Sequence, residues 1–165
     1  MPMALQSFAA KHPLQGPNKP HDAEDELRKL TEEDGVVLLS SSPFPEPVPG
    51  NPGYPEGRHL WVILPERLPV LQETAPRVRP PPLQSVRAKH TNLTGGDPAC
   101  CGGELWIDAA SPDLLYVNGG SGRYQPRSPA ELADVVQVFE GIGYRVVSAG
   151  WDEDNDKPAR VFRQP

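Results

Sequence analysis

Hydrophobic residues recur at helical spacing in one stretch near the C-terminus, "SPAELADVVQVFEGIG", residues 128–143. Ser128 is a suitable N-cap, Pro129 fits the first helical position, and Glu131 can complete a capping box. A glycine at position 141 or 143 can stop the helix. The apolar residues that share one face are Leu132, Val135, Val136 and Phe139. This spacing predicts one amphipathic helix that packs on a core.

Short apolar runs elsewhere predict β-strands. The runs "GELWID" (103–108) and "LLYVNG" (114–119) flank the turn residues "AASPD", which favours a hairpin. After the helix, "YRVVSAGW" and "ARVFR" are separated by the acidic turn "DEDNDKP". Together with "RHLWVIL" (58–64), these runs and the helix predict the fold class α+β. We expect a curved antiparallel sheet with one main helix.

The first part of the chain is rich in proline. Sixteen of the 22 prolines lie in residues 1–82, where they disfavour helices and central strands. We therefore expect residues 1–57 to form an acidic, proline-rich, extended N-terminal arm with a short helix. Residues 58–165 are expected to form the α+β domain.

Three weaker elements are predicted inside this proline-rich part. The stretch "HDAEDELRKLTEEDG" (21–35) predicts the short helix, with Asp22 as its cap, and "VVLLSS" (36–41) predicts a strand. Prolines favour a loop or a single helical turn over residues 65–82. The run "LQSVRAK" (83–89) is compatible with a short strand or a helix.

The net charge of −6 is unevenly distributed. Residues 1–57 carry a net charge of −5, whereas residues 58–165 carry −1. A strongly basic surface of the kind that binds nucleic acid is therefore not indicated. Cys100 and Cys101 are neighbours and cannot link distant segments, so no disulfide framework is expected. Adjacent cysteines with His90 also make a poor zinc site, and we expect no metal and no cofactor.

No apolar run approaches the length of about 18 residues that a membrane-spanning helix needs. The first residues, "MPMALQSFAAKHPLQGP", do not combine a charged region with a long apolar one, as export signals do. We therefore expect a cytoplasmic protein with no membrane partner. Delivery into a target cell by a signal-independent secretion route would leave the same sequence pattern.

Candidate chemistry is concentrated in two glycine-rich segments. The first, "KHTNLTGG" (89–96), contains His90, whose imidazole can take and return a proton near neutral pH. Lys89, Thr91 and Asn92 beside it can supply a charge and hydrogen bonds to a substrate. The alternative is a purely structural role, in which His90 only forms a hydrogen bond within a turn.

The second segment, "NGGSGRYQP" (118–126), contains Ser121, Arg123 and Tyr124. Its glycines let backbone N–H groups approach a ligand, and the guanidinium of Arg123 suits a phosphate or a carboxylate. A tight turn with Tyr124 in the core is the bland alternative. Glu104, at the start of a predicted strand, can contact the substrate or act as an acid/base if it faces His90.

The two segments together resemble a pattern found in bacterial effector-like proteins and in plant calmodulin-binding IQ-motif proteins. That pattern runs His-Ser-Ser-Phe-Leu-x-Gly, a small-residue stretch, a strand pair, and Ser-Gly-His-Tyr-x-Pro before a helix. The matching letters here are "HTNLTGG" (90–96), "ACCGGE" (99–104) and "SGRYQP" (121–126). Arg123 stands where the pattern has a histidine, and no calmodulin-binding IQ motif is present. The resemblance covers about a third of the chain and implies no particular chemistry.

A looser resemblance is to small toxin nucleases of the RelE, barnase and EndoU type, which combine one helix with a curved sheet and a histidine-bearing glycine loop. It favours a bacterial effector or toxin domain that acts as a metal-independent ribonuclease on RNA or a nucleotide. His90 would be the general base, Arg123 and Lys89 would stabilise the phosphate charge, and Ser121 or Tyr124 would position or protonate. A cognate immunity protein, antitoxin or other partner would bind through the N-terminal arm.

Two other function classes stay open at this stage. An NAD-dependent ADP-ribosyltransferase toxin, with NAD as co-substrate, would use His90, Tyr124 and either Glu104 or Glu131. A non-enzymatic protein-interaction module would use the proline-rich segment for docking, and the glycine loops would then be structural turns.

Overall fold

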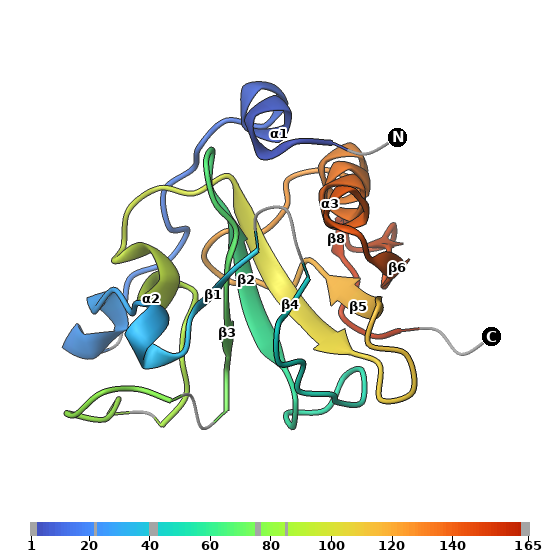
Figure 1. Ribbon diagram of the computed structural model, residues 1–165. Coiled ribbons are helices and arrows are strands. Elements are labelled where there is room, and N and C mark those ends of the chain that lie inside the picture. The colour runs from blue at the N-terminus through green and yellow to red at the C-terminus, as the bar shows by residue number, and fades with distance from the viewer. Residues whose placement is uncertain (1–2, 22, 40–42, 75–76, 85, 163–165) are drawn as a thin grey trace.

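The computed structural model describes residues 3–21, 23–39, 43–74, 77–84 and 86–162. Its centre is a mixed, mostly antiparallel sheet of six strands in the order β1-β3-β2-β4-β5-β6. One long helix, α3, packs beside it (Figure 1). The strands are β1 (Val37–Leu38), β2 (His59–Ile63), β3 (Pro69–Gln72), β4 (Cys101–Ile107), β5 (Leu114–Asn118) and β6 (Arg145–Ser148).

Helix α3 (Pro129–Ile142) forms where the hydrophobic spacing predicts it. The hydroxyl of Ser128 accepts a hydrogen bond from the backbone N–H of Glu131, which confirms Ser128 as the N-cap. The carboxylate of Glu131 does not close the predicted capping box but contacts Arg127 and His12. Because α3 connects β5 to β6 as a crossover, these two strands are parallel, while the remaining neighbours in the sheet are antiparallel.

Several elements differ from the sequence prediction. Strand β3 lies within the proline-rich run that was expected to be a loop or a helical turn, and it pairs with β2. The predicted helix at 21–35 is replaced by two short 3₁₀ helices, η1 (Glu24–Leu27) and η2 (Glu32–Asp34); its proposed cap, Asp22, lies outside the described residues. Of "VVLLSS", two residues form β1, and Ser40 and Ser41 are not described.

The last part of the chain also departs from the expectation. The predicted run "YRVVSAGW" does form a strand, β6, which pairs with β5. Around the acidic turn, a two-stranded sheet of β7 (Trp151–Asp152) and β8 (Lys157–Pro158) takes the place of the predicted pairing with "ARVFR". Residues 159–162 are not strand, and Arg163 lies outside the described residues. Two further short helices were not predicted: α1 (Leu5–Lys11) and α2 (Thr91–Thr94).

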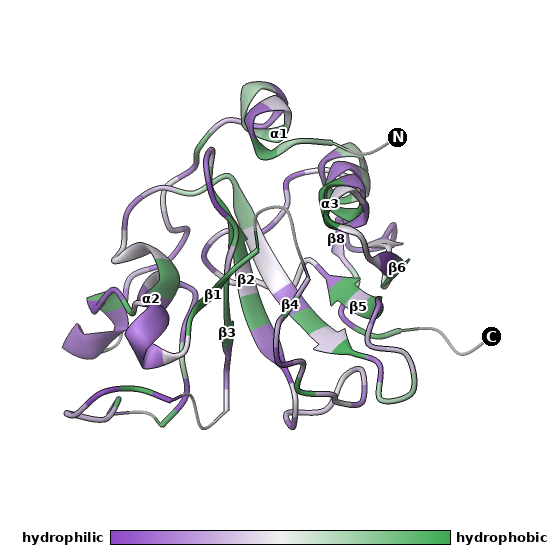
Figure 2. Cartoon of the chain, viewed as in Figure 1, coloured by the Kyte–Doolittle hydropathy of each residue, from purple (hydrophilic) through white to green (hydrophobic). Residues whose placement is uncertain are grey.

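The sheet has a separate hydrophobic core on each face. On the α3 face, Trp61 packs edge-on against Phe139, with ring centroids 5.6 Å apart. Phe8 of α1 and Leu39 are buried in the same core, so residues from the proline-rich part help to cover the sheet. On the opposite face, Leu60, Leu93 and Tyr124 belong to a second core. In Figure 2, green hydrophobic segments recur along β2, β4 and β5.

Two adjacent glycines in β4 allow close packing on both faces. A Cβ atom on Gly103 would lie 2.1 Å from the backbone oxygen of Asn118 and 2.6 Å from the ring of Trp61. On the other face, a Cβ atom on Gly102 would lie 3.0 Å from the ring of His90. Strand β4 therefore needs glycine at its centre, although glycine weakens an ordinary strand.

We expect Gly103→Ala to lower the free energy of unfolding by at least about 2 kcal/mol, because the added methyl group overlaps backbone and a buried indole. Urea denaturation followed by circular dichroism would measure this change. Gly16→Ala is the matched control, since a Cβ atom there would meet nothing within 4 Å. Equal stability of the two variants would contradict the packing described for β4.

Candidate functional site

The two glycine-rich segments meet over the centre of β4. A Cβ atom on Gly102 would lie 3.0 Å from Cδ2 of His90 and 3.5 Å from Oγ of Ser121, so both side chains border the same glycine. The backbone N–H of Gly102 donates to the backbone oxygen of Tyr124 at 2.7 Å. The structure therefore brings the His90 loop and the Ser121 loop together on the sheet face opposite α3.

His90 precedes helix α2 and is buried, with 8% of its surface exposed. Its Nε2 lies 2.9 Å from the backbone oxygen of Gly103; a carbonyl only accepts, so Nε2 carries the proton and Nδ1 is unprotonated. Burial lowers the pKa of His90 to about 4, and the nearby charges of Arg123, Arg160 and Lys89 act in the same direction. His90 is therefore a neutral imidazole at physiological pH.

Ser121 and Tyr124 have structural contacts in this arrangement. The hydroxyl of Ser121 accepts a hydrogen bond from the backbone N–H of Tyr124 at 3.0 Å. The ring of Tyr124 is fully buried, and its hydroxyl donates to the backbone oxygen of Asp97 at 2.8 Å and lies 2.8 Å from Oγ1 of Thr94. Burial also raises the pKa of Tyr124. The phenol thus joins the loop to α2 and the segment after it.

Arg123 is buried, with 5% of its surface exposed. Its guanidinium forms an ion pair with Glu26 of η1 and donates to the backbone oxygen of Pro20 at 3.3 Å. Its Nε is buried and has no hydrogen-bond partner among the described residues. The guanidinium therefore links the Ser121 loop to the N-terminal part of the chain, while its Nε–H donates no hydrogen bond to the described residues.

The residues around His90 differ in whether their side chains already form hydrogen bonds within the protein. Asn92 accepts from the backbone N–H of Lys89 at 2.8 Å and donates to backbone oxygens of η1 and the residue after it, Asp25 and Arg28. Its amide is thus fully employed, whereas Lys89 is half-buried. The hydroxyl of Thr91 is buried and has no partner in the described part of the chain. Among these predicted contact residues, Thr91 is the one with a buried side-chain oxygen that lacks a hydrogen-bond partner in the described chain.

Glu104 and Glu131, the candidate acids, lie in different places. Glu104 is on the same sheet face as Gly102, where it accepts a hydrogen bond from the amide of Asn118 at 3.1 Å and lies 3.6 Å from Nε of Arg58. Glu131 is on α3, where His12 and Arg127 contact it. The structure thus brings Glu104, but not Glu131, to the face that holds His90 and Tyr124.

Asn118 is a site residue that the sequence interpretation missed. Its Oδ1 accepts from the backbone N–H groups of Glu104 and Gly120, at 3.1 and 2.9 Å. It therefore fixes the start of the Ser121 loop against β4. An asparagine directly before a glycine pair was the available signal, because its short amide readily bonds the backbone two residues on.

A cavity of about 530 Å³ opens beside Arg123, and we call it the Arg123 cavity. The N-terminal segment forms one side of it, and the backbone N–H of Asn18 donates to the backbone oxygen of Arg123 at 2.9 Å. The Lys19 side chain extends to within 3.2 Å of the position that a Cβ atom on Gly122 would take. Its lining residues are Pro17, Asn18, Lys19, Pro20, His21, Leu27, Thr91, Gly95, Gly96, Asp97 and Arg123.

Cys100 and Cys101 lie next to this site but not in the cavity. Both thiols are free and fully buried. Burial raises the pKa of Cys100 to about 11 and that of Cys101 well above its usual value. Neither cysteine is a reactive nucleophile in this state.

The described residues contain no group of three or more histidine, cysteine or acidic side chains placed to hold a metal ion. In the same part of the chain, no helix combines the length and the apolar composition that a membrane span requires. No family model, curated protein or solved structure matches this chain.

The buried histidines predict a specific dependence of stability on pH. Burial lowers the pKa of His59, on β2, to about 4, as it does for His90, so the unfolded chain takes up these protons more readily than the folded one. The free energy of unfolding should be nearly constant between about pH 6.5 and 8 and fall between pH 6.5 and 4, by at most roughly 3 kcal/mol for each histidine. Urea denaturation across this pH range should show a smaller fall for His90→Gln than for the wild type.

Exposed His21 provides the control for this experiment, because His21→Gln should keep the wild-type pH dependence. If His90→Gln loses as much stability on acidification as the wild type does, the imidazole is not held neutral by burial.

Proposed function

We propose that this protein binds the phosphate group of an RNA or nucleotide ligand in the Arg123 cavity. The observation that carries the proposal is the unused hydrogen-bonding capacity at the cavity: Thr91 and Arg123 both line it, and each has a buried polar atom without a partner in the described chain. Lys19 adds an exposed ammonium group at the same cavity. Phosphate oxygens accept from such donors.

The energetics favour a ligand at this position. A buried donor without a partner costs about 1–3 kcal/mol. Because Oγ1 of Thr91 and Nε of Arg123 are both buried, the two side chains have to turn toward the cavity before a ligand oxygen can accept from them and recover this cost. Opposing charges limit the affinity, because Glu26 pairs with Arg123 and Asp97 lines the cavity. A free phosphate ion should therefore bind more weakly than a nucleotide, whose sugar and base supply additional contacts.

The activity we propose for this site is metal-independent ribonuclease action by a bacterial effector or toxin domain. The neutral imidazole of His90 is in the protonation state that a general base needs, although its low pKa makes it a weak one. His90 is buried and is not among the residues that line the Arg123 cavity, so the ring has to become accessible before it can take a ribose 2′-OH proton. The likeness to toxin nucleases also depends on a curved sheet, and the curvature stays a prediction. A cognate immunity protein as partner stays a prediction too.

Two alternative functions stay proposals. NAD carries a pyrophosphate that could use the same phosphate site, and His90, Tyr124 and Glu104 lie on one face of the sheet, so an ADP-ribosyltransferase is the second candidate. The third candidate is a non-enzymatic protein-interaction module that docks through the proline-rich segment and needs no turnover. The buried and hydrogen-bonded Tyr124 supports this third candidate.

Thr91→Val gives the sharpest test of phosphate binding. Valine has nearly the same shape, so removing a hydroxyl that has no partner should raise the free energy of unfolding by about 1 kcal/mol. The same substitution should weaken binding of AMP or a short single-stranded RNA, because the ligand loses that hydroxyl. Calorimetric titration and urea denaturation would measure the two effects, which have opposite directions.

Two further variants serve as comparisons. Thr94→Val removes a hydroxyl that is in use with Tyr124 and the N–H of Gly96, so it should destabilise the protein instead. Lys19→Gln should weaken binding of the same probes, whereas Lys157→Gln, an exposed lysine on β8, should not. Wild-type affinity in both Thr91→Val and Lys19→Gln, or no binding by the wild type, would refute the phosphate site.

Catalysis is tested separately, with total RNA in the presence of a chelator. If His90 is the base, His90→Gln should abolish cleavage, and the wild-type rate should stay constant from pH 8 to about pH 5 and fall near pH 4, because the imidazole is protonated only there. His12→Gln, at the contact between α1 and α3, is the control. Equal cleavage by wild type and His90→Gln would exclude His90 as the base, and release of nicotinamide from NAD would favour the transferase instead.

A further inference from the structure

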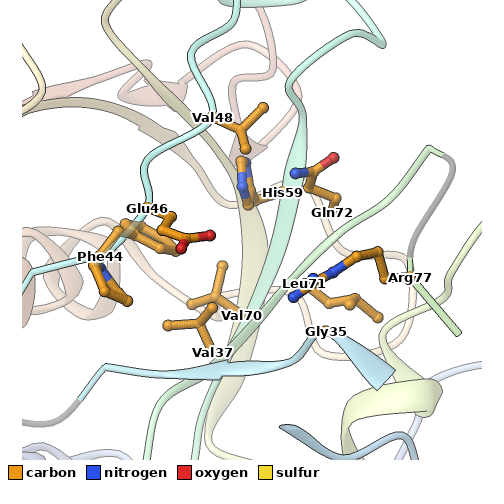
Figure 3. Close-up of a pocket in the computed structure, with 11 residues that line it drawn as sticks. Gly35, Val37, Phe44, Glu46, Val48, His59, Val70, Leu71, Gln72 and Arg77 are labelled. Atoms are coloured by element: carbon orange, nitrogen blue, oxygen red, sulfur yellow. The ribbon is translucent and has the colours of Figure 1, made fainter. Parts of the chain in front are cut away.

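A second cavity, of about 350 Å³, lies on the other face of the sheet, where β1, β3 and β2 meet the segment 44–48 (Figure 3). Side chains alternate along a strand, and His59 and Val70 share the face of Trp61, which is the α3 face. The cavity is therefore separated from the Arg123 cavity by the sheet. We call it the Glu46–Arg77 pocket; its lining residues are Gly35, Val37, Phe44, Pro45, Glu46, Val48, His59, Val70, Leu71, Gln72 and Arg77.

The floor and one wall of this pocket are apolar and well fixed. Val37 of β1 pairs with Val70 of β3, and both side chains lie at the bottom of the view in Figure 3. Phe44 packs against His59, with ring centroids 5.5 Å apart, and its backbone N–H donates to the hydroxyl of Tyr144 at 2.7 Å. A ligand in this pocket would therefore contact a preformed apolar surface.

Two opposite charges face this apolar surface. Figure 3 shows Glu46 and Arg77 on opposite sides of the pocket, with their charged ends directed inward and Val37 and Val70 between them. Both residues are exposed, and within the described residues neither takes part in an ion pair. The amide of Gln72 adds a further hydrogen-bonding group to the lining.

His59 restricts which groups a ligand can present. It is 4% exposed, and its Nδ1 lies 2.8 Å from the backbone oxygen of Gly57, so Nδ1 carries the proton and Nε2 can only accept. Burial keeps the ring neutral at pH 7, because it lowers the pKa to about 4. A ligand group that meets Nε2 has to be a donor, such as an ammonium group or a hydroxyl.

We propose that the Glu46–Arg77 pocket binds a free α-amino acid with an apolar side chain. Glu46 would pair with the ammonium group, Arg77 with the carboxylate, and the side chain would lie against Val37, Val70 and Phe44. The volume is at the lower end of the range of roughly 300–1,000 Å³ for ligand pockets, which favours a small molecule. A purely apolar ligand would pair with neither charge, and an anion would meet Glu46.

Calorimetry with leucine and two leucine derivatives tests this assignment. N-acetylleucine lacks the ammonium group and leucinamide lacks the carboxylate, so each should bind the wild type at least tenfold more weakly than leucine. Glu46→Gln should bind leucine at least tenfold more weakly and no longer discriminate against N-acetylleucine. Arg77→Gln should weaken leucine binding similarly and no longer discriminate against leucinamide. Glu46→Gln thus loses only the preference for a ligand with a free ammonium group, and Arg77→Gln only the preference for one with a free carboxylate.

Glu66→Gln and Arg67→Gln are the matched controls. Both residues are exposed at the turn between β2 and β3 and do not line the pocket. Leucine affinity should therefore be unchanged in both variants. Absence of leucine binding at millimolar concentration would overturn the proposal. It would also be overturned if the wild type bound a leucine-containing peptide with blocked termini as tightly as leucine, because the occupant would then be a chain segment. Neither result bears on phosphate binding at the Arg123 cavity.

Discussion

The architecture depends on close packing against both sides of β4 at Gly102 and Gly103. The indole of Trp61 lies over one side, and its Nε1 donates to the backbone oxygen of Glu104 at 3.1 Å. The ring of His90 lies over the other side and bonds the backbone oxygen of Gly103. Two side chains are thus held by the backbone of one strand, and the core on one face is coupled to the candidate site on the other.

The candidate site is assembled from three distant parts of the chain. The His90 loop and the Ser121 loop meet on the sheet, and the N-terminal part closes over them through the ion pair between Arg123 and Glu26. The side chain of Gln15 contributes to this closure by donating to backbone oxygens of Cys100 and Gln125. Breaking a buried ion pair by removing one partner typically costs about 3–5 kcal/mol, so the N-terminal part is integral to the site.

The parts of the fold that could be predicted from the sequence are those with strong local signals. Helix α3 has hydrophobic spacing and a capping serine, and β2, β4 and β5 are apolar runs bounded by turn residues. Strand β3 was missed because Pro69 and the surrounding prolines suggested a loop, although proline is tolerated at the first position of a strand. The parallel pairing of β6 follows from the crossover through α3, which no local pattern reports.

The candidate site could be predicted only in outline. The ribonuclease hypothesis required the two glycine-rich segments to come together, but the sequence alone did not decide this, and the burial of His90 and the hydrogen bonds of Tyr124 depend on tertiary packing. Lys19 and Glu26 reach the site from the N-terminal part, and nothing in the spacing of the sequence links them to Arg123.

The accessibility of the adjacent cysteines Cys100 and Cys101 is also set by tertiary packing. Both sulfur atoms are buried at the start of the central strand, so alkylating reagents can reach them only when that strand separates from its surroundings. Alkylation of these two cysteines therefore reports transient opening of the core.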